Sequence, residues 1–150
     1  MPIAIQKGSN IWSGPSFPVP GWIRIFRPLN LLIVFIGCTV GSMLVHGASI
    51  SSGDLPYLTL ISGLSAVLIA GFGNITNDIA DVEIDRINRS DRALPSGEVS
   101  IPVVWLLALL CLTCALLLAW SLTTYHVAVV SGAAVLLTAY NWILDRKSVV

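Results

Sequence analysis

The chain has 150 residues, of which 55% are hydrophobic and 11% are charged, and its mean hydropathy is +0.85. Soluble domains carry charge on about 25% of their residues. Because so few charges cannot cover a water-facing surface, the composition excludes a soluble globular domain and predicts an integral membrane protein. The formal net charge is zero. It offers no attraction for nucleic acid, so we expect no nucleic-acid partner.

The first 21 residues are rich in glycine, proline and serine. This composition is typical of a segment that builds no packed core, so 1–21 is predicted to be a flexible tail. Residues 22–27 then mix aromatic side chains with Arg24 and Arg27. That mixture suits a membrane–water interface, and Pro28 fits the first turn of a helix that begins there.

Four apolar segments follow, each near the roughly 20 residues that a membrane-spanning helix needs. We predict helices at about 29–45, 56–73, 101–122 and 125–144, and therefore an all-α polytopic membrane helix bundle. Ser100 is the expected N-cap of the third helix, with Pro102 in its first turn. Glycines allow close helix packing in membranes, here at Gly37 and Gly41 of the first helix and Gly63 and Gly73 of the second. Cys111 and Cys114 have CxxC spacing, but in mid-helix we interpret them as small apolar side chains.

The placement of arginine predicts the orientation of the bundle, because cytoplasmic loops carry an excess of Lys and Arg. Arg24 and Arg27 precede the first helix, and three more arginines lie in residues 86–92 after the second. The connection 46–55 has neither Lys nor Arg, and neither does the turn after the third helix. We therefore expect the N-terminus and the acidic loop to be cytoplasmic, in the cell (plasma) membrane.

Residues 74–85 carry the chemistry, because they continue an apolar segment and yet contain several acids. At about 100° per residue, one side of a helix through 74–85 collects the amides and aspartates, whereas Glu83 falls opposite. The members of this polar stripe are Asn74, Asn77, Asp78, Asp81 and Asp85. Ionisable groups in a membrane segment indicate function.

Adjacent carboxylates repel each other unless a cation lies among them. Mg2+ prefers such oxygen ligands and shares them with substrate phosphates, so we predict a metal–phosphate site. The alternative is a solvated helix end, but the stripe is one-sided and begins within the apolar segment at Asn74. A calcium loop of EF-hand type needs another ligand spacing and a turn glycine, and is excluded.

The segment 77–97 resembles the first aspartate-rich motif of the UbiA-type prenyltransferase superfamily. The resemblance rests on Asn77-Asp78-x-x-Asp81-x-x-x-Asp85 followed by Arg89-x-x-Arg92-x-Leu-Pro95-Ser96-Gly97. Arg27-Pro28-x-Asn30 is similar to the N-terminal motif of that family, and Tyr140-Asn141-Trp142 to the end of its fourth helix. The resemblance covers about residues 22–144, which we interpret as the N-terminal part of a UbiA-type transmembrane domain.

The family implies a bundle of nine transmembrane helices, of which four are present here, with two aspartate-rich motifs facing one cavity. It also implies that Mg2+ grips a prenyl diphosphate and that an acceptor attacks the allylic cation left when diphosphate departs. Carried over to this chain, the metal ligands are Asn77, Asp78 and Asp81, with Asp85 joining them or orienting a neighbour. Candidates for diphosphate contact are Asn77, Arg89, Arg92 and Arg27. Arg89 and Arg92 are alternatively candidates for ordering the loop, and Arg27 is alternatively a plain positive-inside anchor.

Several alternatives remain open at this stage. The segment 82–89 with its Pro-Ser-Gly tail is similar to geranylgeranylglyceryl phosphate geranylgeranyltransferases of ether-lipid synthesis, which is the favoured branch. Quinone-pathway and chlorophyll-pathway enzymes carry related tails. A CDP-alcohol phosphotransferase also uses spaced aspartates, but the Asp-Gly and Ala-Arg pairs of its motif are absent from 74–97. A non-enzymatic four-helix membrane protein, including a truncated one, predicts instead that the stripe tolerates substitution.

The second aspartate-rich motif implied by the family is missing, because residues 98–144 contain no Asp and only one Glu. The last six residues, Asp145-Arg-Lys-Ser-Val-Val150, match the in-frame translation of a widely used sequencing adapter whose next codon is a stop. We therefore expect 145–150 to be adapter read-through and native sequence to end near Leu144. We also expect the 150-residue chain to be inactive alone.

Overall fold

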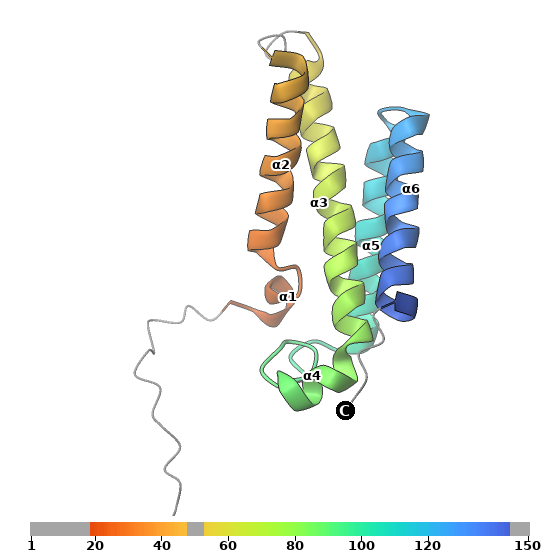
Figure 1. Ribbon diagram of the computed structural model, residues 1–150. Coiled ribbons are helices and arrows are strands. Elements are labelled where there is room, and N and C mark those ends of the chain that lie inside the picture. The colour runs from red at the N-terminus through yellow and green to blue at the C-terminus, as the bar shows by residue number, and fades with distance from the viewer. Residues whose placement is uncertain (1–18, 48–52, 145–150) are drawn as a thin grey trace, which may run out of the picture.

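The computed structural model describes residues 19–47 and 53–144, and all of its regular elements in these ranges are helices. In chain order they are α1 (Gly21–Arg24), α2 (Pro28–His46), α3 (Leu55–Ala80), α4 (Val82–Asn88), α5 (Ile101–Trp120), α6 (Thr124–Ala139) and the π-helical turn Tyr140–Leu144. Figure 1 shows α2 and α3 as one long hairpin, with α5 and α6 on the other side of α3. The short helices α1 and α4 lie at the end of the bundle where α3 ends.

The four predicted membrane helices are confirmed. The described residues contain four helical stretches long and apolar enough to cross a membrane: Gly21–Val45, Leu55–Ala80, Ile101–Trp120 and Thr124–Ile143. Ser100 is the N-cap of α5 as predicted, but its side chain forms no capping hydrogen bond. The last helix changes character near its end, since the α-helix stops at Ala139 and a π-helical turn follows.

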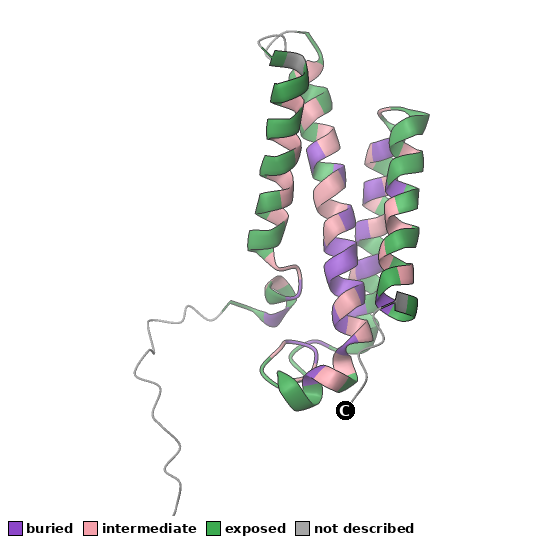
Figure 2. Cartoon of the chain, viewed as in Figure 1, coloured by how far each residue is buried: buried purple, intermediate pink, exposed green. Residues whose placement is uncertain are grey.

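The best-packed part of the bundle is the contact between α3 and α5. One face of α5 presents small or medium side chains at helical spacing: Val104, Ala108, Cys111, Ala115 and Ala119, all buried. Small residues let two helix backbones approach closely. The hydroxyl of Ser65 on α3 donates a hydrogen bond of 3.0 Å to the carbonyl of Ala115 across this contact. Figure 2 shows the buried residues concentrated along α3 and the facing side of α5.

The outer faces of the helices are apolar and exposed. Leu44, Leu106 and Val129 have exposed fractions of 82%, 65% and 71%. Soluble monomers rarely expose such continuous apolar surface, whereas helices that satisfy their own backbone hydrogen bonds can face lipid. The chain is therefore an integral membrane protein.

The glycine predictions divide between the two helices of the hairpin. A methyl group at Gly63 would lie 3.0 Å from the Phe35 ring, and one at Gly73 would lie 3.0 Å from Leu137, so close packing is confirmed at both positions. Close packing is absent at Gly37 and Gly41, which have no neighbour within 4 Å among the described residues. Both glycines are exposed, and none of the described helices packs against their side of α2.

Two predicted terminal segments lie largely or wholly outside the described residues, namely the tail at 1–21 and the segment 145–150. The boundary at 21 is wrong, because Gly21 begins α1 and is buried. A methyl group there would lie 3.2 Å from the Ala93 side chain and closer still to Glu98, so α1 packs tightly on the loop before α5.

Candidate active site

The polar stripe bends at Asp81. Helix α3 ends at Ala80 and α4 begins at Val82, with Asp81 at φ −87° and ψ −3° between them. The segment 74–85, placed on one helix above, is therefore divided between two helices. The hydrogen bonds continue through the bend, from Asp81 N to Asn77 O at 2.9 Å and from Asp85 N to Asp81 O at 2.8 Å. The bend redirects α4 away from the axis of α3 (Figure 1).

The stripe's three carboxylates are buried despite the bend. The exposed fractions of Asp78, Asp81 and Asp85 are 8%, 8% and 6%. Glu83 is exposed and pairs with Arg86 at 2.8 Å, which confirms that it lies apart from the aspartates. Burying a carboxylate is costly unless it is paired and hydrogen-bonded. The site must therefore supply cations of its own or bind one.

Two arginines from separate parts of the chain supply that charge. Arg92, in the loop after α4, hydrogen-bonds through Nη1 to Asp85 Oδ2 and lies 3.5 Å from Asp78 Oδ1. Arg27, between α1 and α2, donates through Nη2 to the same Asp78 Oδ1. Asp78 thus joins two guanidinium groups that are 65 positions apart in the sequence (92 − 27).

Arg27 has a strained backbone conformation at this contact. Its φ of 52° and ψ of 67° are left-handed, and it is the one non-glycine residue with positive φ in the described ranges. The conformation costs about 1–3 kcal/mol. The following Pro28 would by itself favour extended backbone at Arg27, so the left-handed conformation is imposed by the surrounding fold. This strained turn places the Arg27 side chain against Asp78.

Asparagines fasten the base of α2 to α3 beside this pair. Asn30 Nδ2 donates to Asn74 Oδ1 at 3.1 Å, and Asn74 Nδ2 donates to the Phe26 carbonyl at 2.9 Å. One turn later, Asn77 Nδ2 donates to Asp81 Oδ2 at 2.9 Å. These bonds hold the start of α2 and the end of α3 at a fixed separation.

The structure thus gathers most of the predicted site residues, with one exception and one addition. Asp78, Asp85, Arg27 and Arg92 meet directly, and Asn77 contacts Asp81. Arg89 is exposed and forms no ion pair within the part of the chain that is described.

The addition is Arg24, which the sequence suggested only as an interfacial cation. It pairs with Glu98 and lies 3.5 Å from the Asp91 carbonyl. Its spacing of three residues from Arg27 was the one signal in the sequence, because such residues share a helix face.

A polar cavity of about 260 Å³ opens beside the arginines. Its lining comes from α1, the end of α3 and the loop before α5: Arg24, Ile25, Arg27, Asp78, Asp91, Arg92 and Ala93. Three guanidinium groups therefore converge on one hollow at the end of the bundle.

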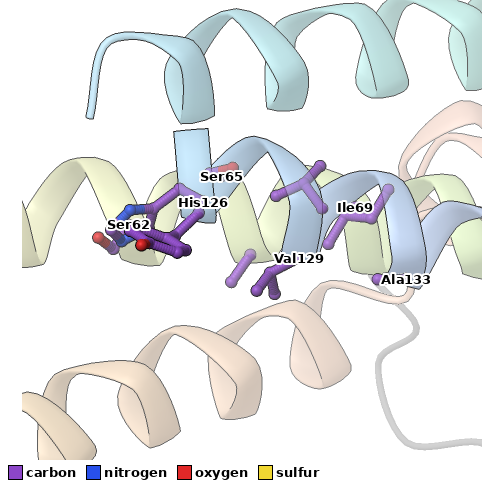
Figure 3. A pocket seen from close by; sticks show the side chains of 9 residues that line it. Ser62, Ser65, Ile69, His126, Val129 and Ala133 are labelled. Atoms are coloured by element: carbon purple, nitrogen blue, oxygen red, sulfur yellow. The ribbon is translucent and has the colours of Figure 1, made fainter. Parts of the chain in front are cut away.

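A second cavity, of about 340 Å³, lies between α3 and α6 (Figure 3). Ser62, Ser65 and Ile69 line it from α3, and His126 and Val129 from α6. At 100° per residue, its α3 lining faces away from Asn74 and Asp78. This mostly apolar cavity is therefore separate from the aspartate site.

The donors of the stripe fit a hard cation. The described residues contain no group of three or more His, Cys, Asp or Glu placed to hold a metal. Mg2+, however, is usually bound by one or two carboxylates together with substrate phosphates. Asp78 and Asp81, with the neighbouring amide of Asn77, provide oxygen ligands of that type.

The chain matches the UbiA prenyltransferase family over residues 31–150. It is 33% identical over 131 residues to the digeranylgeranylglyceryl phosphate synthase of Methanoculleus marisnigri, covering 87% of this chain and 45% of that protein. It is 34% identical over 121 residues to the synthase of the same name from Methanopyrus kandleri, covering 81% and 42%. The namesake from Thermococcus sibiricus is 41% identical over 81 residues, covering 53% and 27%.

The chain thus spans less than half the length of the curated relatives it matches. No solved structure matches it. The family match covers most of the chain, including the aspartate stripe and the π-helical turn, and agrees with the all-helical fold. The chain therefore belongs to the UbiA prenyltransferase family.

Proposed function

We propose that the chain forms part of a membrane prenyltransferase that moves a prenyl group from a prenyl diphosphate to a lipid acceptor. The favoured acceptor is a geranylgeranylglyceryl phosphate, so the reaction belongs to ether-lipid synthesis. The names of the relatives support this branch over the quinone-pathway and chlorophyll-pathway alternatives. The role proposed for residues 22–144 is the N-terminal part of the transmembrane domain.

The observation that carries the proposal is the meeting of Arg27, Arg92, Asp78 and Asp85 at the end of an apolar helix. A solvated helix end would leave its acids exposed, whereas Asp78 and Asp85 are buried. A channel lines its pore with rings of charge of one sign, whereas here the arginines and aspartates pair with each other. Diphosphate chemistry needs both signs of charge, aspartates for a cation and arginines for phosphate oxygens.

In the proposed reaction, the bond between the allylic carbon and the diphosphate oxygen breaks, and both electrons leave with diphosphate. The acceptor hydroxyl then forms a carbon–oxygen bond to the allylic carbon and gives up its proton. Bound Mg2+ supplies positive charge against the oxygens of the leaving group. Asn77, Asp78 and Asp81 are the residues proposed to hold it, with Asp85 alongside.

The arginines are proposed to bind the diphosphate. Arg27 and Arg92 present planar guanidinium groups, whose paired N–H donors match phosphate oxygens. They stabilise the negative charge that develops as diphosphate departs. Arg89 remains a candidate for ordering the loop rather than for contact, because it is exposed.

The prenyl tail is proposed to lie along the face of α3 that leads to the site. Leu60, Leu64 and Val67 share the helical face of Asp78. The 18 positions from 60 to 78 span about 27 Å at 1.5 Å per residue. An apolar wall of this length holds a long isoprenoid and keeps water from the allylic cation.

The orientation is also part of the proposal. The N-terminus and residues 89–99 are placed on the cytoplasmic side of the plasma membrane, in keeping with the arginine distribution. A cysteine introduced at Ser96 is then labelled by an impermeant thiol reagent only from the cytoplasmic side, and one at Gly53 only from the opposite side.

The test of function uses membranes that carry the product of the complete source gene. Radiolabelled geranylgeranyl diphosphate is offered with geranylgeranylglyceryl phosphate, with an aromatic acid acceptor, or with neither. Transfer to the glyceryl phosphate alone supports the ether-lipid branch. Transfer to the aromatic acid would replace that branch by the quinone-type one, and no transfer to any acceptor by an inserted protein would refute the enzyme.

A further inference from the structure

The polar cavity lies beside the aspartate stripe but is a distinct site. Of the stripe, only Asp78 lines the cavity, whereas Asn77, Asp81 and Asp85 lie outside its lining. The remaining walls come from α1 and from the segment Asp91–Ala93. A group in the cavity would therefore lie beside a diphosphate held at the stripe.

Two of the arginines retain unused donors. A guanidinium group has five N–H donors. Among the described residues, Arg27 bonds its side-chain partner through Nη2 alone, and Arg92 through Nη1 alone. The remaining nitrogens of both groups are free to bind an anion while the pairs with Asp78 and Asp85 stay intact.

Arg24 is the third guanidinium, and its partners lie in a different part of the molecule. It pairs with Glu98, which is itself exposed, and both side chains are at least 40% exposed. An exposed pair of this kind contributes little stability. Because the pair is weak, Arg24 can exchange Glu98 for a phosphate ligand at small cost.

The size and position of the cavity suit a lipid head group. About 260 Å³ is below the usual range of roughly 300–1,000 Å³ for pockets that enclose drug-sized ligands. It excludes a long isoprenoid but admits a small phosphate ester. Helix α1, which forms one wall, also carries the exposed Trp22, a residue type enriched at membrane–water interfaces.

We infer that this cavity binds the phosphate head group of the acceptor lipid. Arg24 is the arginine that contacts this phosphate and not the donor diphosphate. The inference rests on the proposed function. Arg24 binds this phosphate, and Arg27 and Arg92, which are proposed to bind the diphosphate, border both sites and reach the head group through their remaining nitrogens. Asp91 also lines the cavity and offers an acceptor for a glycerol hydroxyl. The ligand class is a glycerol phosphate, namely an anionic monoester with a hydroxyl close by.

The test measures binding to the purified product of the complete source gene in detergent by calorimetry. The probes are glycerol phosphate, inorganic phosphate, and pyrophosphate with Mg2+. Arg24→Gln should weaken glycerol phosphate about tenfold or more, as expected for loss of a charge-assisted hydrogen bond, and leave pyrophosphate within about twofold. Asp81→Asn should do the reverse. Arg86→Gln, which alters an exposed arginine away from the cavity, is the matched control and should change neither.

Two further variants keep the inference testable if Arg24→Gln does not fold. Arg24→Lys keeps the charge and the pair with Glu98 but loses the planar fork, so glycerol phosphate binding should still weaken. Glu98→Gln releases Arg24 and should tighten that binding several-fold. Unchanged glycerol phosphate binding in both variants would overturn the inference.

The results with the different probes also distinguish a failure of this inference from a failure of the proposed function. Equal loss of glycerol phosphate and pyrophosphate in Arg24→Gln would assign the cavity to the donor and overturn the inference. Glycerol phosphate binding no tighter than that of inorganic phosphate would overturn the head-group assignment. If pyrophosphate binds with Mg2+ and glycerol phosphate does not, the inference fails and the proposed function stands. If glycerol phosphate binds and pyrophosphate with Mg2+ does not, the proposed donor site is refuted and the inference about the cavity stands.

Discussion

The side chain of Asn141 donates a hydrogen bond of 2.9 Å from Nδ2 to the hydroxyl of Thr76, and both residues are buried. Asn141 lies in the π-helical turn, whereas Thr76 lies on α3 immediately before Asn77 and Asp78. Thr76 in turn donates to the carbonyls of Phe72 and Gly73 at 2.9 and 3.2 Å. The bond therefore ties the end of the fourth membrane helix to the turn of α3 that carries the aspartate motif.

Breaking this bond should destabilise the bundle at the site. Asn141→Ala leaves the Thr76 hydroxyl without its donor, and we expect it to lower the free energy of unfolding by about 1–3 kcal/mol. Unfolding in detergent, followed by circular dichroism, measures it. In a double-mutant cycle with Thr76→Val, the coupling should be about 0.5–1.5 kcal/mol. Thr138→Val, which removes an exposed hydroxyl bonded only to the Ala134 carbonyl, is the control. A coupling of zero would show that the contact contributes nothing.

Removing the charge of Arg92 should cost more than removing that of a surface arginine. Arg92→Gln leaves Asp85, which is 6% exposed, without its cation, and we expect a loss of about 3 kcal/mol in the free energy of unfolding. Arg86→Gln breaks only the exposed pair with Glu83 and should cost about 0.5 kcal/mol or less. Adding Asp85→Asn to Arg92→Gln should recover most of the loss, because no buried charge is then left unpaired. Equal stabilities for the two arginine variants would contradict this account.

The glycines of the hairpin should respond oppositely to a larger side chain. Gly63→Leu pushes a side chain into the Phe35 ring, which would lie only 3.0 Å from the first carbon of that side chain, and should destabilise by about 1–3 kcal/mol. Gly41→Leu meets no described neighbour and replaces a poor helix former, so it should be neutral or stabilise by up to about 1 kcal/mol. Thermal unfolding of the two variants in the same detergent decides the matter. Similar losses in both would mean that α2 packs on α3 through a different face.

Activity of the complete gene product should require a divalent cation and the buried aspartates. EDTA should abolish prenyl transfer, because without Mg2+ the leaving diphosphate lacks its counter-charge. Adding Mg2+ should restore the activity. Asp78→Asn and Asp81→Asn should each lower kcat by about 10²-fold or more while membrane insertion, measured by fractionation, is retained. Glu83→Gln, a carboxylate outside the buried cluster, should keep activity within about twofold. Full activity in the two aspartate variants would support the non-enzymatic alternative instead.

The amino-acid sequence by itself determined the membrane class, the four helices and the composition of the site. Helix length against bilayer thickness and the absence of Asp, Glu, Lys and Arg from the four apolar segments are local properties, so the positions of α2, α3, α5 and α6 were predictable, although α3 continues to Ala80, seven residues past the predicted end. The one-sided spacing of Asp78, Asp81 and Asp85 also predicted that Glu83 lies apart from them, and in the structure the three aspartates are buried while Glu83 is exposed.

Only the tertiary structure decided which cation each carboxylate meets. The bend at Asp81 turns α4, and the strained backbone of Arg27 brings an arginine from before α2 onto Asp78. Neither is a property of a helical period, because both depend on how α1 and the loop before α5 pack against the end of α3. For the same reason the role of Arg24, the exposure of Arg89 and the bond from Asn141 to Thr76 were not predictable from spacing. Contacts between residues far apart in the chain are fixed by packing, which no single segment encodes.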